Sequence, residues 1–70
     1  MIYIIECWDR KDQKRVLKGF DKTTPVYVLK GQFNKGAPVQ EFARTDRALA
    51  AAEKIKAAHK WRHIDIIKLV

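Results

Sequence analysis

Few residues in this chain have the types and spacing that chemistry needs. His59 and His63 stand four positions apart, which on a continuous helix would place two metal ligands on one face. We expect the helix to end between them, at Trp61 and Arg62, and no third ligand has a suitable spacing. The pattern therefore predicts neither a metal nor any other cofactor, and His59 is expected to be a packed, hydrogen-bonded ring.

Catalytic groups are equally sparse. Cys7 lies in an apolar segment, where a cysteine behaves as a small hydrophobic residue, so we expect it to be buried and inert. The carboxylates are scattered singly and form no acid and base pair. A core this small also leaves little room for a ligand pocket of the usual ~300 Å³ or more. The sequence therefore predicts a protein that is not an enzyme.

Positive charge is the most informative property of the composition. Fifteen Lys and Arg face eight Asp and Glu, which gives a net charge of +7. This balance favours anionic partners: nucleic acid, an acidic protein surface or an anionic membrane surface. The candidate binding residues form two groups, one in the connection after the first predicted strand and one along the exposed side and ends of the predicted helix. They are Arg10, Lys11, Lys14, Arg15, Lys18, Lys22, Arg44, Arg47, Lys60, Trp61 and Arg62. Trp61 is expected to be exposed, where a base could stack on it.

One amphipathic helix must position the second group of cations. It is predicted from Asp46 to about Trp61, with Thr45 or Asp46 accepting hydrogen bonds from the first turn. Its apolar arc is rich in alanine, which lets the helix lie close to a sheet. The arc contains Ala48, Ala51, Ala52, Ile55, Ala58 and His59, with Leu49 at its edge.

Strand patterns fill most of the remaining chain. Met1–Trp8 carries apolar residues on both faces, which is typical of a central strand. A hairpin is expected from Val26–Phe33, a turn at 34–36 and a returning strand at Val39–Ala43, and the chain closes with a strand at 63–70. Whether Val16–Phe20 forms a strand is left open. The predicted core is Ile4, Ile5, Val28, Leu29, Leu49, Ile55, Ile66 and Ile67.

These elements predict a single α+β domain over residues 1–70. A mostly antiparallel sheet of three or four strands would carry the helix on one face, in the order β-(β)-β-β-α-β. The opposite face would then be uncovered, which favours a homodimer or a partner docked there. A lone cysteine excludes an internal disulfide bond, and no apolar run reaches the ~18 residues of a membrane span. We therefore expect no membrane span and a cytoplasmic location.

The segments VYVLKGQFNKGAPVQEFA, RTDRALAAAEKIKAA and RHIDIIKLV follow one another in the last two thirds of the chain. This layout of a hairpin, a Thr-led alanine-rich helix and a closing strand resembles the small RNA polymerase inhibitors of T7-like phages. The resemblance implies a compact phage protein in the host cytoplasm, whose only activity is a surface that disables a host machine. Many such inhibitors are acidic, and this chain is basic, so no functional residues are carried over.

Three functional hypotheses follow from the sequence. The first is a small basic non-enzymatic regulator or inhibitor, encoded by a phage or mobile element, that binds an acidic surface of a nucleic-acid-handling host protein. The second is direct, non-specific binding of DNA or RNA through the cations and exposed rings. The third is a small homo-oligomeric structural subunit that buries the uncovered sheet face.

Overall fold

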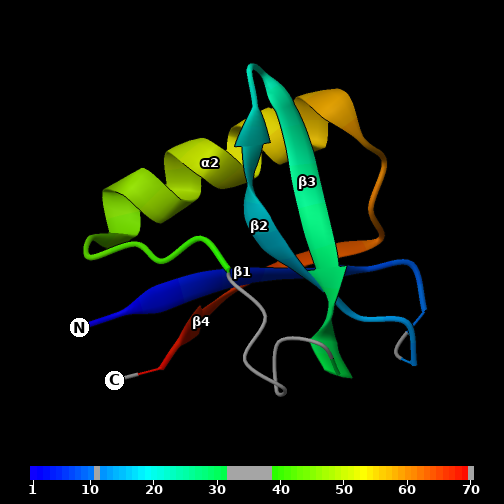
Figure 1. Cartoon of the computed structure of the whole chain (residues 1–70), viewed down its shortest axis with the longest axis horizontal. Coiled ribbons are helices and arrows are strands. Elements are labelled where there is room, and N and C mark those ends of the chain that lie inside the picture. Colours follow the sequence, from blue (N-terminus) through cyan, green and yellow to red (C-terminus); the bar gives the residue numbers. More distant parts are fainter. Residues whose placement is uncertain (11, 32–38, 70) are drawn as a thin grey trace.

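The computed structural model describes residues 1–10, 12–31 and 39–69. Its sheet has the strand order β3-β2-β1-β4, and every neighbouring pair is antiparallel. The strands are β1 (Tyr3–Trp8), β2 (Arg15–Asp21), β3 (Thr24–Leu29) and β4 (His63–Lys68), and the helix α2 (Thr45–Ala58) lies between β3 and β4 in the chain. Figure 1 shows α2 lying across one face of the sheet. The predicted α+β class, with one helix on an antiparallel sheet, is confirmed.

Strand β1 is an interior strand of the sheet, as its pattern predicts. Residues Ile4 to Trp8 are all buried, although successive side chains of a strand point to opposite faces. Ile5 belongs to the core that packs against α2, and Cys7 shares its face. Ile4, Glu6 and Trp8 therefore point away from the helix.

Val16–Phe20, which the sequence left open, is part of strand β2. The two-residue connection Lys22-Thr23 joins β2 to β3, and Lys22 adopts a left-handed backbone with φ 60°. The pairing of the two strands shifts register between Leu17 and Gly19, so the hairpin contains a bulge there. Polar turn residues after Phe20 are the sequence signal for this hairpin.

The second predicted hairpin differs from the structure. Strand β3 ends at Leu29 rather than Phe33, and its partner is β2. The expected turn at 34–36 and the end of the last strand at Val70 lie outside the described residues. The stretch expected to form the returning strand makes only an isolated bridge, between Phe42 and Tyr3.

The reason for this bridge is the short pairing between β1 and β2. The two strands pair only at Glu6 and Cys7, so the first half of β1 is open on that side. The stretch around Phe42 fills the opening, because the Tyr3 and Phe42 backbones exchange hydrogen bonds of 2.8 and 2.9 Å. The backbone N–H of Gln40 donates to the backbone carbonyl of Leu17 in β2 at 2.9 Å. The segment before α2 therefore wedges between two diverging strands.

Helix α2 begins and ends earlier than predicted. Its N-cap residue is Arg44, and no side chain caps the first turn. Arg44 instead holds the Asp46 carboxylate through two hydrogen bonds, at 3.0 Å from Nε and 2.9 Å from Nη2. Because Asp46 accepts from Arg44, the predicted cap is wrong, although a carboxylate in the first turn still suits the helix dipole.

The buried stripe of α2 is the predicted alanine-rich arc, shortened at its end. Ala48, Ala51, Ala52 and Ile55 are buried. The helix ends at Ala58, and the backbone of His59 is extended. Ala58 and His59 are both exposed to solvent, so they do not belong to the buried stripe. The tight alanine face places the helix directly on Ile5 and Leu17, and half-buried rings and aliphatic side chains surround this core: Phe20, Tyr27, Phe42, Trp61, Ile64 and Ile66.

The predicted core is partly right. Ile4, Ile5 and Ile55 are buried, and Val28, Ile66 and Ile67 are half-buried. Leu29 and Leu49 are exposed, at 44% and 56%, so their prediction as core residues is wrong. Leu29 is the last residue of an edge strand, and Leu49 lies just beside the narrow alanine stripe.

The sheet face opposite α2 is not bare, contrary to the prediction. Ile4 is 2% exposed and Val16 is fully buried on that face. Buried Glu6 accepts from Lys30 Nζ at 2.9 Å and lies 3.3 Å from Lys14 Nζ. The Trp8 ring stacks on His63 with centroids 5.3 Å apart, and Lys14 Nζ lies 5.1 Å from its centroid. Charged side chains and rings therefore cover part of this face.

Candidate binding surface

The structure brings cations from the two predicted clusters together at the tip of the β2–β3 hairpin. Lys22 in the turn and Lys54 of α2 line one hollow of about 430 Å³, with Phe20 between them. Lys54 Nζ lies 5.8 Å from the centroid of the Phe20 ring. Ala57 and Ala58 also line it. The lining of this hollow therefore combines apolar side chains with two lysines.

A second hollow, of about 410 Å³, continues the first along α2. It shares Phe20 and Lys54 with the first hollow and adds Arg47 and Ala50. Among the described residues that line the two hollows, Glu41 is the only carboxylate. We call this joint surface, with Lys22, Arg47 and Lys54 as its cations, the cationic track.

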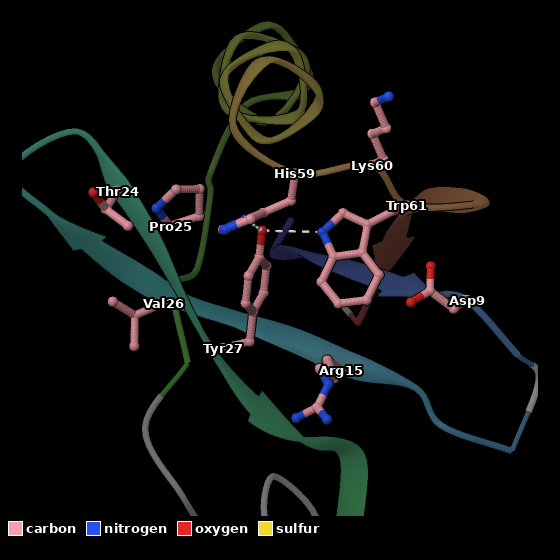
Figure 2. A pocket seen from close by; sticks show the side chains of 9 residues that line it. All are labelled: Asp9, Arg15, Thr24, Pro25, Val26, Tyr27, His59, Lys60 and Trp61. Carbon is pink, nitrogen blue, oxygen red and sulfur yellow. Dashed lines mark hydrogen bonds between the residues drawn. The ribbon is translucent and has the colours of Figure 1, made fainter.

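A third and larger hollow lies on the β3 side of the hairpin tip and has a volume of about 590 Å³. We call it the ring hollow. Figure 2 shows Tyr27 and His59 side by side in it, with Trp61 next to Tyr27. Its lining residues are Asp9, Arg15, Thr24, Pro25, Val26, Tyr27, His59, Lys60 and Trp61. These hollows are larger than the small core was expected to allow, because they form on the surface between elements.

Hydrogen bonds hold the three rings in place. Trp61 Nε1 donates to the Tyr27 hydroxyl at 3.1 Å, and the same hydroxyl lies 2.9 Å from His59 Nδ1. The Trp61 and Tyr27 rings meet edge to face, with centroids 5.1 Å apart. Burial raises the pKa of Tyr27, and the hydrogen bond from Trp61 opposes that rise. The arrangement ties the segment after α2 to strand β3.

Two expectations about these rings need correction. Trp61 was expected to be exposed, and it is half-buried because its indole nitrogen bonds to Tyr27 and its ring packs against the core. His59 is hydrogen-bonded as expected, but it is exposed rather than packed in the helix stripe. Both differences arise because the helix ends at Ala58 and the chain turns toward β3.

Arg15 and Lys60 are predicted cations from distant parts of the chain that line the same hollow. Arg15 lies on β2 and is half-buried, whereas Lys60 is exposed on the connection to β4. Neither forms an ion pair with any residue that the structure describes. Asp9 is the only carboxylate among the described lining residues.

The other predicted binding residues lie elsewhere. Lys14 pairs with Glu6 and Arg44 pairs with Asp46, and neither cation lines these hollows. Lys18 borders a smaller hollow of about 340 Å³ beside Phe20 and Val26. Arg10 and Arg62 are exposed and line none of these hollows, and Lys11 lies outside the described residues.

Two observations bear on the groups that the sequence considered for catalysis and metal binding. Cys7 is fully buried, as predicted, and burial raises its pKa to about 12, although Arg15 opposes the rise. Its thiol is therefore neutral near pH 7 and lacks the thiolate that reacts. No group of three or more His, Cys, Asp or Glu residues is placed to hold a metal ion within residues 1–10, 12–31 and 39–69. None of the described helices has the length and apolar character needed to cross a membrane.

Sequence reasoning identified the cations but not the surfaces that collect them. Phe20 and Tyr27 are half-buried and pack against the core, and each also lines a hollow, which the sequence did not indicate. The turn residues Thr23 and Thr24 gave no functional signal in the sequence. Comparisons with protein-family models, with curated proteins and with solved structures found no match to this chain.

Proposed function

We propose that this protein is a small non-enzymatic regulator or inhibitor that binds an acidic segment of another protein along the cationic track. One observation carries the proposal: Lys22, Arg47 and Lys54 lie around one apolar concave surface, although they come from the hairpin turn and from two turns of α2. An acidic peptide with apolar side chains complements both the charge and the floor of this surface.

The alanine floor supports docking of side chains rather than charge attraction alone. Ala50, Ala57 and Ala58 expose small side chains beside Phe20, which leaves the hollows that a partner's apolar groups can enter. Burial of such groups stabilises a complex by roughly 25 cal/mol per Å² of apolar area. The three solvent-exposed cations add charge complementarity, which raises both the rate of encounter and the affinity for an acidic partner.

The state of the rings favours a protein partner over nucleic acid. Bases stack on open aromatic faces. Lys54 lies over the Phe20 ring, and the Trp61 ring is held edge to face on Tyr27 by a hydrogen bond. A base could stack on that face of Phe20 only by displacing Lys54. The regulator would act on a nucleic-acid-handling protein in the host cytoplasm, which is the first of the three hypotheses drawn from the sequence.

Direct nucleic-acid binding is the second candidate. Arg10, Lys18 and Arg62 are exposed and form no ion pair with the described residues, so they remain available to phosphates. Homodimerisation through the face opposite α2 has less support, because Ile4 and Val16 are already buried there.

The two candidates are separated by affinity purification from bacterial lysate with and without nuclease, using the wild-type protein and a Lys22→Gln/Lys54→Gln variant. The proposal predicts a captured protein that survives nuclease treatment and is lost with the double variant. Gel shift with single-stranded and duplex DNA should then show only weak, non-specific binding, near ~10⁻⁴–10⁻⁶ M at physiological salt. Capture that disappears with nuclease, together with a gel shift at lower protein concentration, would favour the second candidate.

A further inference from the structure

We propose that the ring hollow is an anchor site for an aromatic side chain of the acidic segment, with a neighbouring carboxylate of that segment bound by Arg15. This inference rests on the proposed function and assigns a specific chemistry to one end of the same interface. The occupant is a phenylalanine, tyrosine or tryptophan next to an aspartate or glutamate.

The walls of the hollow suit a ring. Pro25, Val26, Tyr27 and Trp61 provide apolar and aromatic surface around a volume of about 590 Å³. Aromatic rings prefer edge-to-face or offset contacts, and Tyr27 and Trp61 already show the edge-to-face arrangement. Because hydrogen bonds fix the two rings before anything binds, a partner's ring meets walls that need little reordering.

Arg15 supplies the specific polar group. Its guanidinium has five N–H donors, and it is half-buried beside the hollow without an ion-pair partner in the described chain. A carboxylate can accept two parallel hydrogen bonds from such a group. Lys60 adds a second positive charge at the hollow.

Asp9 restricts how a carboxylate can enter. Figure 2 shows Arg15 below Tyr27 and Asp9 on the far side of Trp61. Like charges repel, so an acidic group is favoured at the Arg15 side and disfavoured near Asp9. The hollow thus defines a direction for the bound segment.

The ring hollow and the cationic track meet at the hairpin tip. Thr23 and Ala58 line the track, whereas their chain neighbours Thr24 and His59 line the ring hollow. A single extended segment can therefore pass from one surface to the other. This continuity is why we assign both to one partner.

The test uses three fluorescently labelled peptides with the 70-residue chain. The first contains one phenylalanine flanked by aspartates within a longer acidic stretch, the second replaces the phenylalanine by alanine, and the third replaces the two flanking aspartates by asparagine. Burying the phenylalanine should strengthen binding about tenfold or more over the alanine peptide. Equal affinity of the phenylalanine and alanine peptides would overturn the inference.

Variants assign the effect to the hollow. Arg15→Lys keeps the charge and removes the guanidinium fork, so it should lose most of the preference for aspartate over asparagine next to the ring. Arg10→Gln is the control, because Arg10 is exposed and does not line the hollow; it should keep that preference. Circular dichroism checks that each variant is folded. An unchanged preference in folded Arg15→Lys would contradict the role of Arg15.

Failure of the inference can be told from failure of the proposed function. If the phenylalanine and alanine peptides bind equally well and both are lost with Lys22→Gln/Lys54→Gln, the track binds acidic peptide but the ring hollow is not an anchor. If no acidic peptide binds while a single-stranded oligonucleotide changes Trp61 emission, both proposals are wrong. Because Trp8 also emits, a Trp61→Phe variant shows whether the change in emission comes from Trp61.

Discussion

The two faces of the sheet are buried to similar degrees by different chemistry. Toward α2, the side chains of Ile5, Leu17 and Ile55 are fully buried in an apolar core. Away from α2, Ile4 and Val16 are just as inaccessible, but they share their face with the buried carboxylate of Glu6 and with Trp8. Two lysines satisfy Glu6, and a lysine and a histidine contact Trp8.

This difference shows how the described residues bury side chains on both faces of the sheet, although α2 packs on only one of them. The helix face depends on the fit of apolar side chains, which is costly to disturb. The opposite face depends partly on ion pairs whose lysines remain 32% and 44% exposed, and such pairs contribute less because solvent screens them. We therefore expect substitutions to destabilise the helix face more than the opposite face.

The largest effect should come from the helix face. Ile55→Ala should lower the free energy of unfolding by ~2–5 kcal/mol, because it leaves a cavity in a fully buried site. Leu49→Ala in the same helix is the control, since Leu49 is 56% exposed, and it should change stability by no more than about 0.5 kcal/mol. Thermal and urea melts measure both. Similar losses for the two variants would mean that the stripe of α2 is assigned wrongly.

Glu6→Gln tests the opposite face. The amide keeps the shape but removes the charge that holds Lys14 and Lys30, so we expect a loss of about 1–3 kcal/mol. Asp65→Asn also replaces one carboxylate by an amide and serves as the control. Asp65 stands opposite Glu6 in the register of β1 and β4, and its side chain is exposed. Urea denaturation at neutral pH gives both values. A Glu6 variant as stable as the wild type would show that the ion pairs contribute nothing to this face.

Alkaline pH should weaken the protein through Cys7. Burial raises the folded-state pKa of Cys7 from 9.0 to about 12, so between these values the unfolded chain releases a proton that the folded chain keeps. Stability should therefore be unaffected below about pH 9 and fall above it, with a slope of at most about 1.4 kcal/mol per pH unit. Tyr27 adds to the loss at higher pH, because its pKa is also raised. In Cys7→Ala the decline between pH 9 and 10 should be shallower, and an identical slope would contradict the assignment.

Tyr27→Phe should have the smallest effect on stability. It removes the hydroxyl that accepts from Trp61 and contacts His59, at an expected cost of about 0.5–1.5 kcal/mol. The emission of Trp61 should shift as its indole N–H loses its partner, and Trp61→Phe identifies the Trp8 background. Tyr3→Phe is the control, since Tyr3 contacts only the sulfur of Met1 through its hydroxyl among the described residues. If Trp61 emission does not change, the rings are not coupled as described.

The sequence predicts the elements better than their boundaries and contacts. The two-sided apolar pattern of 1–8 correctly predicts a central strand, and the alanine stripe correctly predicts the helix face. The β2–β3 pairing was missed, because Val16–Phe20 is short and its alternation is interrupted by the bulge between Leu17 and Gly19. Asp46, which was predicted to cap the helix, instead accepts hydrogen bonds from the Arg44 side chain. The periodicity of the sequence does not show this contact.

The candidate surface was less predictable than the fold. Charge alone pointed to the right residue types but could not show that Glu6 engages Lys14 or that Asp46 engages Arg44. The meeting of Lys22 with Lys54, and of Arg15 with Lys60, depends on where the hairpin tip lies against α2. Such placement follows from tertiary packing, so the two clusters were predicted as separate strips.

We propose that the position of the track cations, and not net charge, determines binding. The most direct measurement compares two double variants that lose the same charge. Lys22→Gln/Lys54→Gln removes two cations from the track, whereas Lys56→Gln/Lys68→Gln removes two cations that do not line it. Affinity for the labelled acidic peptide with phenylalanine is measured at physiological salt. We predict that the track variant binds the peptide about tenfold or more weakly, because two lost contacts worth ~1.4 kcal/mol together change Kd by that factor. The control variant should bind less than about threefold more weakly. Equal losses in the two variants would contradict the claim and leave only non-specific attraction to a basic protein.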